Sequence, residues 1–370
     1  MLACAFLSPR STSAQSDAQS WALGPFQRPV STPVIKPSPL PLFSDPVTGK
    51  PVHWESEHTF NPAAVVNDGK IVVLYRAEDD SGLEAIGGHT SRLGLATSDD
   101  GVHFTTLPEP VFYPANDAQH EREWPGGVED PRLVVTEDGT FVLTYTQWNR
   151  KTYTVGIASS RDLLHWQKHG PIFGDAAGAK YRRLAYKSAG IVTKVVDGHL
   201  VAALLNGKYW MYWGEVQVHL ATSPDLIHWI PVEDQTGRPK VLLEARPGLF
   251  DSGFPEIGAP PVLLRDGIIV FYNGKNAAAN GDPEIGSNAY SAGQALFSVA
   301  DPSLLIARQD HPYLSPQLPF EKRGQYAAGT VFTEGLVLFK GAWWLYYGAA
   351  DSFVGVATAV APPVNARRSR

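Results

Sequence analysis

The stretch Asn61-Pro-Ala-Ala-Val-Val-Asn-Asp-Gly-Lys-Ile-Val-Val-Leu-Tyr75 contains the structural unit from which this chain is built. Two apolar runs, at 63–66 and 71–75, flank Asp68-Gly69, and an Asp-Gly pair between apolar runs is a strong signal for a β-hairpin. A third apolar run follows at 93–97. The same order returns around turns at 138–139, 197–198, 266–267 and 340–341, at intervals of 59 to 74 residues.

Five such units predict an all-β protein with the fold of a five-bladed β-propeller, because repetition at a steady period is typical of radially repeated β architectures. The innermost strands of a propeller converge on its axis. We therefore expect the functional pocket where the first strand of each unit begins. The expected strands, three to a unit, are 63–66, 71–75 and 93–97; 133–136, 141–147 and 155–159; 191–196, 200–205 and 216–222; 261–264, 268–273 and 294–299; 335–339, 343–348 and 354–358.

The chain divides into three expected segments. Residues 1–20 are expected to be either a signal peptide whose start is truncated or misassigned, or a disordered leader. The protein is expected to be periplasmic or secreted in the first case and cytoplasmic in the second. Eight prolines in residues 21–55 predict an extended arm that wraps the fold or reaches a second copy, so a homo-oligomer is one expectation. Residues 56–362 are expected to form the propeller.

The composition excludes several classes of partner and site. The chain has 370 residues, a net charge of −6 and no block rich in Lys and Arg, so nucleic acid is not an expected partner. No run of 18 apolar residues occurs, so we expect no membrane-spanning helix. Cys4 is the single cysteine, which excludes an internal disulfide and a Cys-based metal site.

Polar tags close the second and third units, with the sequences Ser160-Arg-Asp-Leu-Leu-His-Trp166 and Ser223-Pro-Asp-Leu-Ile-His-Trp229. Because these positions repeat with the unit, they are expected to stabilise the repeat itself. We expect each His to bond within an outer turn and each Trp to pack between blades. Helix propensity is high only around 176–187, which predicts one short helix there.

Polar or ionisable residues precede the first strand of every unit, and one further acid follows the second strand of unit three. Two carboxylates that face each other across a pocket are what glycosidic cleavage needs, one to protonate the leaving oxygen and one to activate water or attack the sugar. A solvated channel that tolerates charge is the alternative interpretation. The residues are Asn61, Glu129-Asp130, Lys187, Glu256 and Tyr326, with Glu215 as the further acid.

The segments Tyr75-Arg-Ala-Glu-Asp79, Gly94–Phe104 and Gly127-Val-Glu-Asp-Pro-Arg132 resemble glycoside hydrolase family 130. The resemblance covers residues 61–358 and implies a five-bladed propeller that acts on β-mannosides. It implies that Asp130 is a proton donor acting through a substrate hydroxyl. It also implies that sugar hydroxyls are held by charge-assisted hydrogen bonds from Asn61, Arg76, Asp79 and Arg132. We add Lys187 and Tyr326 to the candidate substrate-binding residues.

The identity of the attacking group depends on the remaining acids. A phosphorylase needs several cationic donors for phosphate, whereas a hydrolase needs a carboxylate that holds water and repels phosphate. The setting of Glu215 and Glu256 resembles the hydrolase branch of the family, so we take Asp130, Glu215 and Glu256 as the catalytic set. We expect an inverting glycoside hydrolase that releases mannose from β-1,2-linked mannosides. The alternative is a β-mannoside phosphorylase that forms mannose 1-phosphate, with Lys187, Arg182 and Arg183 receiving phosphate.

Two non-enzymatic alternatives are a carbohydrate-binding propeller and a protein-interaction scaffold, and the acids at the strand starts argue against both. No cofactor is expected. His58, His89 and His120 lie in loops near acids but lack the spacing of a metal-binding motif, so no metal site is expected. The loops at 115–125 and 274–291 are expected to shape the entrance of the pocket.

Overall fold

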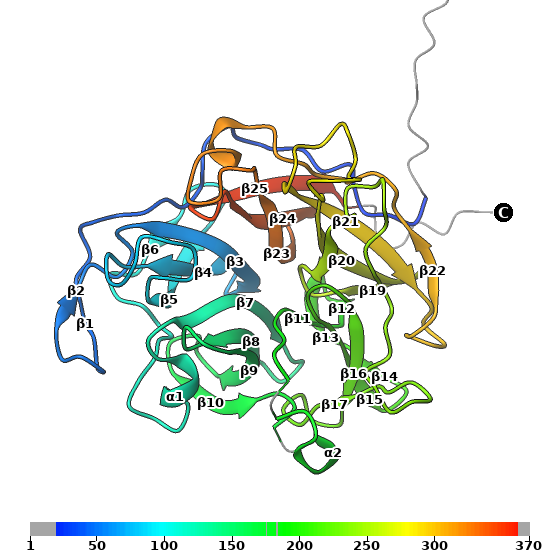
Figure 1. Cartoon of the computed structure of the whole chain (residues 1–370), viewed down its shortest axis with the longest axis horizontal. Helices are drawn as coiled ribbons and strands as arrows, with labels where there is room; N and C mark the ends of the chain where they lie inside the picture. The colour runs from blue at the N-terminus through cyan, green and yellow to red at the C-terminus, as the bar shows by residue number, and fades with distance from the viewer. Residues whose placement is uncertain (1–19, 175, 183, 362–370) are drawn as a thin grey trace, which may run out of the picture.

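The computed structural model describes residues 20–361 apart from 175 and 183 (Figure 1), so the predicted leader lies outside the described residues except for Ser20. Within this range the protein is nearly all-β, with 25 strands. The helical segments are α1 (His120–Glu123), α2 (Ala176–Ala179) and the 3-10 helix η1 (Pro319–Glu321). In the described part of the chain no helix has the length and apolarity to cross a membrane. The helix predicted over 176–187 is confirmed only at 176–179.

The first two repeat units share one eight-stranded sheet. The turn of unit one has φ of 48° at Asp68 and 73° at Gly69, the left-handed conformation that a two-residue hairpin turn requires. A parallel bridge between Ser91 and Gly127 joins the two units. The strands are β3 (His58–Asn67), β4 (Lys70–Glu78), β5 (Ser91–Ser98), β6 (Thr105–Thr106), β7 (Gly127–Val135), β8 (Phe141–Trp148), β9 (Tyr153–Ser160) and β10 (Trp166–Pro171).

Unit three differs from its prediction because Asn206-Gly207 makes a second hairpin turn, with φ of 53° and 74°. The run 200–205 is therefore divided between two hairpins, and the aromatic stretch 208–213 is a central strand that the prediction lacked. The resulting five-stranded sheet consists of β11 (Ala189–Ile191), β14 (Leu204–Leu205), β15 (Lys208–Trp213), β16 (His219–Ser223) and β17 (Ile230–Pro231).

The hairpin at the Asp197-Gly198 turn joins the sheet of unit four through a parallel pairing of β12 with β19. This seven-stranded sheet contains β12 (Thr193–Val196), β13 (His199–Ala202), β18 (Phe254–Ile257), β19 (Val262–Leu264), β20 (Gly267–Lys275), β21 (Tyr290–Phe297) and β22 (Leu305–Arg308). Unit five forms a three-stranded sheet of β23 (Val331–Phe339), β24 (Ala342–Ala349) and β25 (Phe353–Val360).

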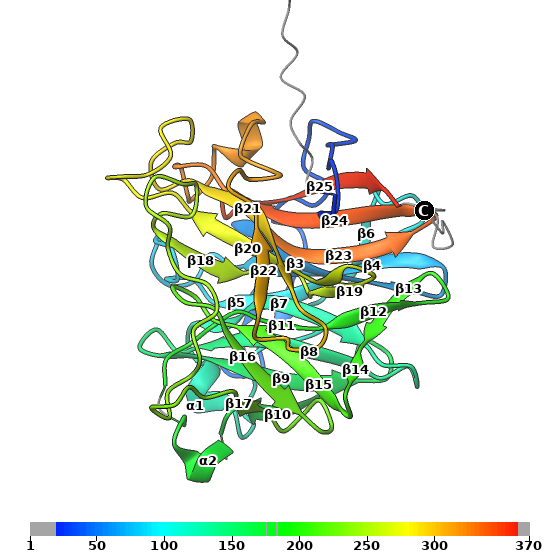
Figure 2. The same cartoon turned by 90° about the vertical axis from the view of Figure 1, so that its right-hand side faces the viewer.

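The sheets are arranged around a common centre. Figure 1 shows β3, β7, β11 and β23 near the middle and β6, β10, β17 and β22 at the rim, and Figure 2 shows the same sheets from the side. The blade count stays a prediction, because the strands group into sheets of eight, seven, five, three and two. The starts of β3, β7 and β18 lie next to the pocket described below.

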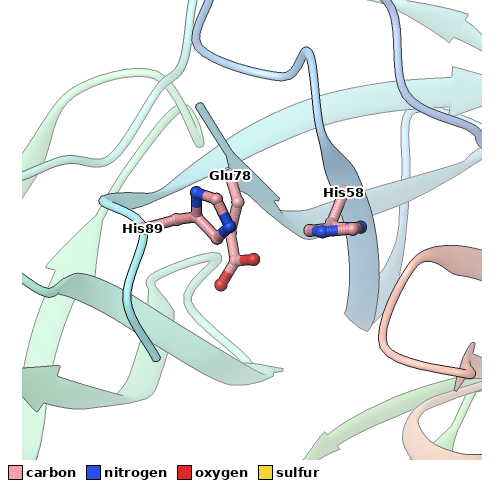
Figure 3. Close-up of side chains that lie close together, drawn as sticks. All are labelled: His58, Glu78 and His89. Atoms are coloured by element: carbon pink, nitrogen blue, oxygen red, sulfur yellow. The ribbon is translucent and has the colours of Figure 1, made fainter. Parts of the chain in front are cut away.

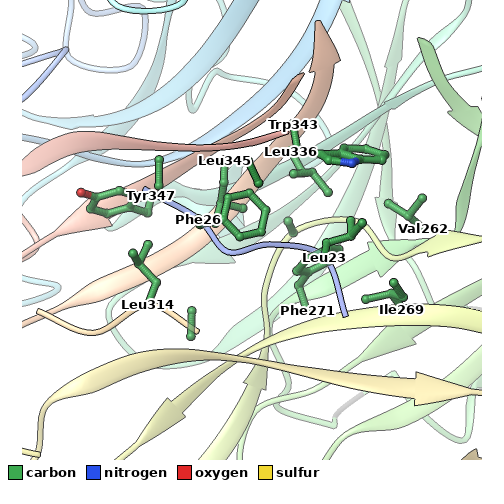
Figure 4. Close-up of a cluster of buried hydrophobic side chains, with 14 of the residues drawn as sticks. Leu23, Phe26, Val262, Ile269, Phe271, Leu314, Leu336, Trp343, Leu345 and Tyr347 are labelled. Carbon is green, nitrogen blue, oxygen red and sulfur yellow. The ribbon is translucent and has the colours of Figure 1, made fainter. Parts of the chain in front are cut away.

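The Pro-rich segment packs against its own chain. Isolated bridges join Gln27 to Thr358 and Ile35 to Val354, alongside β25. Leu23 and Phe26 enter the apolar core between β20 and β24 (Figure 4). The segment also carries the short hairpin of β1 (Phe43–Ser44) and β2 (Pro51–Val52).

The polar tags have the structural role that their repetition predicts. His165 and His228 each lie 2.7 Å from a carboxylate oxygen three residues earlier, Asp162 and Asp225, in exposed turns. Trp229 is buried and donates a hydrogen bond to the Leu226 carbonyl. These histidines therefore stabilise turns and lie away from the pocket.

Candidate functional site

A cavity of about 340 Å³ opens near the centre of the fold and is strongly acidic. Its ionisable lining consists of two cations and five carboxylates, and its aromatic lining suits stacking against sugar rings. The cations are Arg76 and Lys187; the carboxylates are Glu129, Asp130, Glu215, Glu256 and Asp351; the aromatic residues are Phe60, Trp148, Tyr153, Tyr290, Tyr326 and Phe332.

Asn61 and Asp130 occupy equivalent bulges in β3 and β7, where each precedes a proline. Both have positive φ, 46° and 48°, so each side chain is redirected out of the regular alternation of its strand. Asn61 Nδ2 donates to Asp130 Oδ1 over 2.7 Å. The buried Oδ1 of Asn61 has no hydrogen-bond partner within the described residues and lies against Gly348 of β24.

A glycine on β24 makes room for this arrangement. A Cβ at Gly348 would lie 2.0 Å from Asn61 Oδ1, closer than any real contact. Only glycine therefore allows β24 to approach Asn61 so closely.

Arg76, on β4, fixes the acids of the pocket wall. Its guanidinium donates to Glu78 over 2.6 Å, to Glu129 over 2.8 Å and to Asp130 over 3.1 Å. Its buried side chain also packs over the Phe60 ring. Although burial opposes the charge, the surrounding carboxylates raise the pKa of Arg76, which therefore stays a cation.

Lys187 brings the three proposed catalytic acids together. Its Nζ lies 3.9 Å from Asp130 Oδ2, 3.9 Å from Glu215 Oε1 and 3.7 Å from Glu256 Oε1. A β-bridge pairs Glu215 with Glu256. Burial opposes the charge of Lys187, but the nearby acids raise its pKa well above the ordinary value, so it is protonated at neutral pH.

The acids of the pocket differ in their protonation. Burial opposes ionisation of Asp130, but Arg76 and Lys187 outweigh it and lower its pKa to about 2. Burial raises the pKa of Glu256 to about 7 despite the opposing effect of Lys187. Burial likewise raises the pKa of Glu129 and of Asp351 to about 7. The pocket thus holds an ionised Asp130 beside carboxyl groups that exchange protons near neutral pH.

A family model described as β-1,4-mannooligosaccharide phosphorylase, of glycoside hydrolase family 130, matches residues 33–363. This chain belongs to glycoside hydrolase family 130. A 1,2-β-oligomannan phosphorylase from Thermoanaerobacter sp. (strain X514) is 31% identical to it over 307 residues, which are 82% of this chain and 90% of that protein.

Solved structures of higher identity also match this family 130 protein. A glycosyl hydrolase from Bacteroides ovatus is 52% identical with a TM-score of 0.90, covering 93% of this chain and 98% of that chain. The description of another structure says that the GH130 family of mannoside phosphorylases contains glycoside hydrolases that target β-1,2 mannosidic linkages in Candida mannan. It is 51% identical with a TM-score of 0.91 and covers 93% and 98% of the two chains.

The sequence-predicted site residues separate into those in the pocket and those behind it. The cavity lining contains Asn61, Arg76, Asp130, Lys187, Glu215, Glu256 and Tyr326. Two residues expected to hold sugar hydroxyls lie outside this lining. Asp79 is fully buried and accepts hydrogen bonds from Ser81, Thr90 and Arg92. Arg132 is buried against Glu334 and donates to the Ile257 carbonyl.

The two described members of the basic cluster suggested as a phosphate receptor line different cavities. Of its members, Lys187 lines this cavity, whereas Arg182 lines a separate cavity with Arg122 and His228. Arg183 lies outside the described residues.

Several pocket residues were missed by reasoning from the sequence: Trp148, Tyr153, Tyr290 and Asp351. Asp351 follows the second strand of unit five, as Glu215 follows that of unit three, so the same positional rule could have found it. The aromatic residues gave no such signal, because aromatic residues are spread throughout the units. Tyr326 donates its hydroxyl to the Asn288 carbonyl, which links the pocket to the 274–291 loop.

One group of potential metal ligands occurs among the described residues, next to Arg76. His58, Glu78 and His89 each offer one ligand atom, and these atoms all lie within 4.8 Å of one another (Figure 3). The sequence predicted no metal site, because these residues come from β3, β4 and a loop and share no motif spacing.

Proposed function

We propose that this protein is an inverting glycoside hydrolase that releases mannose from β-1,2-linked mannosides. The observation that carries the proposal is the pairing of Glu215 and Glu256 around Lys187 in an acidic pocket. Such a pocket suits a water molecule held between carboxylates. It disfavours inorganic phosphate, because both cations of the lining already lie beside carboxylates.

The spacing of the acids is compatible with inversion. One carboxylate oxygen each of Asp130, Glu215 and Glu256 lies within 4 Å of Lys187 Nζ. Any two of these three oxygens are therefore at most about 8 Å apart. An inverting enzyme needs its acid and base carboxyl groups separated by about 6.5–9.5 Å so that water fits between them.

Each acid is assigned a step from its surroundings. Glu256, with a pKa of about 7 and an orientation fixed by the Ser188 hydroxyl at 2.5 Å, removes the proton of the attacking water. Glu215, whose side chain is 21% exposed, accepts a hydrogen bond from the same water on the side of the pocket that faces solvent. The C1–O bond to the leaving sugar breaks as that oxygen takes the proton of a sugar hydroxyl, and the hydroxyl oxygen in turn takes a proton from Asp130.

The low pKa of Asp130 sets a condition on this relay. A carboxylate with a pKa of about 2 is ionised in the free enzyme, so Asp130 must take up a proton before the C1–O bond breaks. It then passes that proton to the sugar hydroxyl and ends the step as a carboxylate beside Arg76 and Lys187. Asn61 and Arg76 hold Asp130 in place for this role.

Phosphorolysis remains the second candidate, because the 31% identical relative is named as a 1,2-β-oligomannan phosphorylase. The hydrolase is favoured by the separation of Arg182 from the pocket and by the 51% identical structure whose description names β-1,2-linkage hydrolases. As part of the same proposal, residues 56–362 form a five-bladed propeller and residues 21–55 an arm bound to it.

The proposal is tested by proton NMR of the first minutes of β-1,2-mannobiose cleavage in wild type, Glu215→Gln and Glu256→Gln. Inversion predicts that the α-anomer of mannose appears first. Loss of the base predicts a kcat about 10²- to 10⁴-fold lower in Glu256→Gln. Glu244→Gln, at an exposed acid away from the cavity lining, is the matched control. Initial β-anomer, or full activity in both pocket variants, would contradict the proposal.

A further inference from the structure

We propose that His58, Glu78 and His89 form a binding site for one divalent transition-metal ion of the Zn²⁺ type, which fastens the 79–90 loop to the wall of the pocket. The site is distinct from the catalytic acids and does not depend on the proposed reaction. His58 and Glu78 are register partners across β3 and β4, and His89 comes from the loop that follows β4. Glu78 is fully buried, and His89 is 6% exposed.

The side chains are oriented as ligands. In Figure 3 the two imidazole rings lie on either side of the Glu78 carboxylate, and one ring nitrogen of His89 points toward it. The ring centroids of His58 and His89 are 5.7 Å apart. The three ligand atoms lie within 4.8 Å of one another, so small side-chain adjustments would bring all three to the roughly 2.0–2.2 Å that Zn²⁺ requires.

The second ring nitrogens are already fixed, as they are in most histidine metal sites. His89 Nδ1 lies 3.2 Å from the Ser81 carbonyl oxygen, which can only accept, so Nδ1 carries the hydrogen and Nε2 keeps its lone pair. His58 Nδ1 lies 2.9 Å from the Ser352 hydroxyl. In the described part of the chain the two rings make no other hydrogen bond, so the protein engages Nε2 of neither ring.

Glu78 retains acceptor capacity for an ion. Its Oε1 accepts from Arg76 and Ser91, whereas its Oε2 accepts from Gln325 over 2.9 Å. A carboxylate oxygen has two lone pairs, so Oε2 can bind a cation while keeping its bond to Gln325. The positive charge of Arg76 nearby is offset by Glu78, Glu129 and Asp130.

The donor set indicates the class of ion. Two imidazole nitrogens and one carboxylate oxygen are ligands typical of Zn²⁺ and related ions, whereas Ca²⁺ and Mg²⁺ prefer oxygen ligands alone. Three protein ligands leave a fourth position for water. No redox step is implied, because the ion serves here to hold the chain.

An ion at this site would affect the structure of the pocket, because the site lies beside the pocket wall. The loop that ends at His89 supplies Ile86 and Gly87 to the cavity lining. Glu78 accepts a hydrogen bond from Arg76, which also donates one to Asp130. An ion at this site would therefore fix one rim of the pocket and the orientation of Arg76.

The test uses the whole chain after dialysis against EDTA. Isothermal titration with ZnCl₂ and elemental analysis after gel filtration are expected to give one Zn²⁺ per chain, and a thermal melt is expected to show a higher Tm with the ion. His58→Ala and His89→Ala are expected to lose the bound equivalent and the rise in Tm. His103→Ala, at an exposed histidine in an outer turn, should bind as the wild type does.

Two outcomes would overturn the inference. The first is the absence of saturable binding by the wild type, or unchanged binding by the two histidine variants. The second is an ion held by the catalytic acids, which would show as loss of binding in Glu215→Gln with binding retained in His89→Ala. Circular dichroism of each variant before titration separates loss of the ligand from loss of the fold.

Discussion

Replacement of Ser188 by alanine tests whether Glu256 is the group that titrates in catalysis. Ser188 precedes β11, and its hydroxyl donates to Glu256 Oε1 over 2.5 Å inside the protein. A hydrogen bond to a charged group contributes about 1.5–3 kcal/mol, and one pKa unit corresponds to about 1.4 kcal/mol. Because the bond favours the ionised form, its removal should raise the pKa of Glu256 by about 1 to 2 units from its value of about 7.

The expected result is a displaced pH profile of kcat/KM on β-1,2-mannobiose. A base must be ionised to accept a proton, so the acidic limb of the profile should move by about 1 to 2 units to higher pH. At pH 6 the variant should be roughly 10- to 100-fold slower than the wild type, and the two should approach each other above pH 9.

A matched control is Ser303→Ala, which removes a serine-to-carboxylate hydrogen bond, to Asp301, on the exposed surface. Its profile should coincide with that of the wild type. A loss of activity in Ser188→Ala that is equal at every pH, with the acidic limb in place, would refute the assignment of Glu256 as the titrating base.

Three further substitutions follow from the structure. Gly348→Ala places a Cβ 2.0 Å from Asn61 Oδ1, so displacement of Asn61 should lower kcat/KM about 100-fold, measured by steady-state kinetics against unchanged circular dichroism. Trp148→Ala removes an aromatic platform of the cavity and should raise KM about tenfold with kcat nearly unchanged; a fall in kcat alone would contradict this role. Burial raises the pKa of Glu55 to about 7, so the folded protein binds more protons than the unfolded chain between about pH 4.5 and 7 and loses stability as pH rises through that window. In Glu55→Gln the free energy of unfolding, measured with urea, should no longer fall with pH in this window. Its difference from the wild type should therefore grow by at most about 1.4 kcal/mol per pH unit. The control Glu57→Gln, at an exposed acid, should show no such difference.

The repeat and the meeting of the acids could be predicted because they depend on local signals. An Asp-Gly turn fixes a hairpin by its φ angles alone, and the turn at Asp68-Gly69 forms as predicted. The acids were located by their position at strand ends, which a radial arrangement brings together. Asp130, Glu215 and Glu256 accordingly surround one ammonium group.

Features that depend on strand irregularity could not be predicted. Side-chain alternation assigns each residue a face, but the bulge between Glu129 and Arg132 breaks that alternation, and Arg132 turns to Glu334. Asp79 lies just past the end of β4, where alternation no longer applies, and it binds Arg92 behind the pocket. The second hairpin turn at Asn206-Gly207 was not recognised, so the strand 208–213 of unit three was missed.

The most direct test of the account is analysis of the products formed from β-1,2-mannobiose with and without inorganic phosphate. The pairing of Glu215 and Glu256 around Lys187 predicts free mannose at the same rate in both buffers. Mannose 1-phosphate that forms only when phosphate is present would contradict the hydrolytic assignment of these two glutamates.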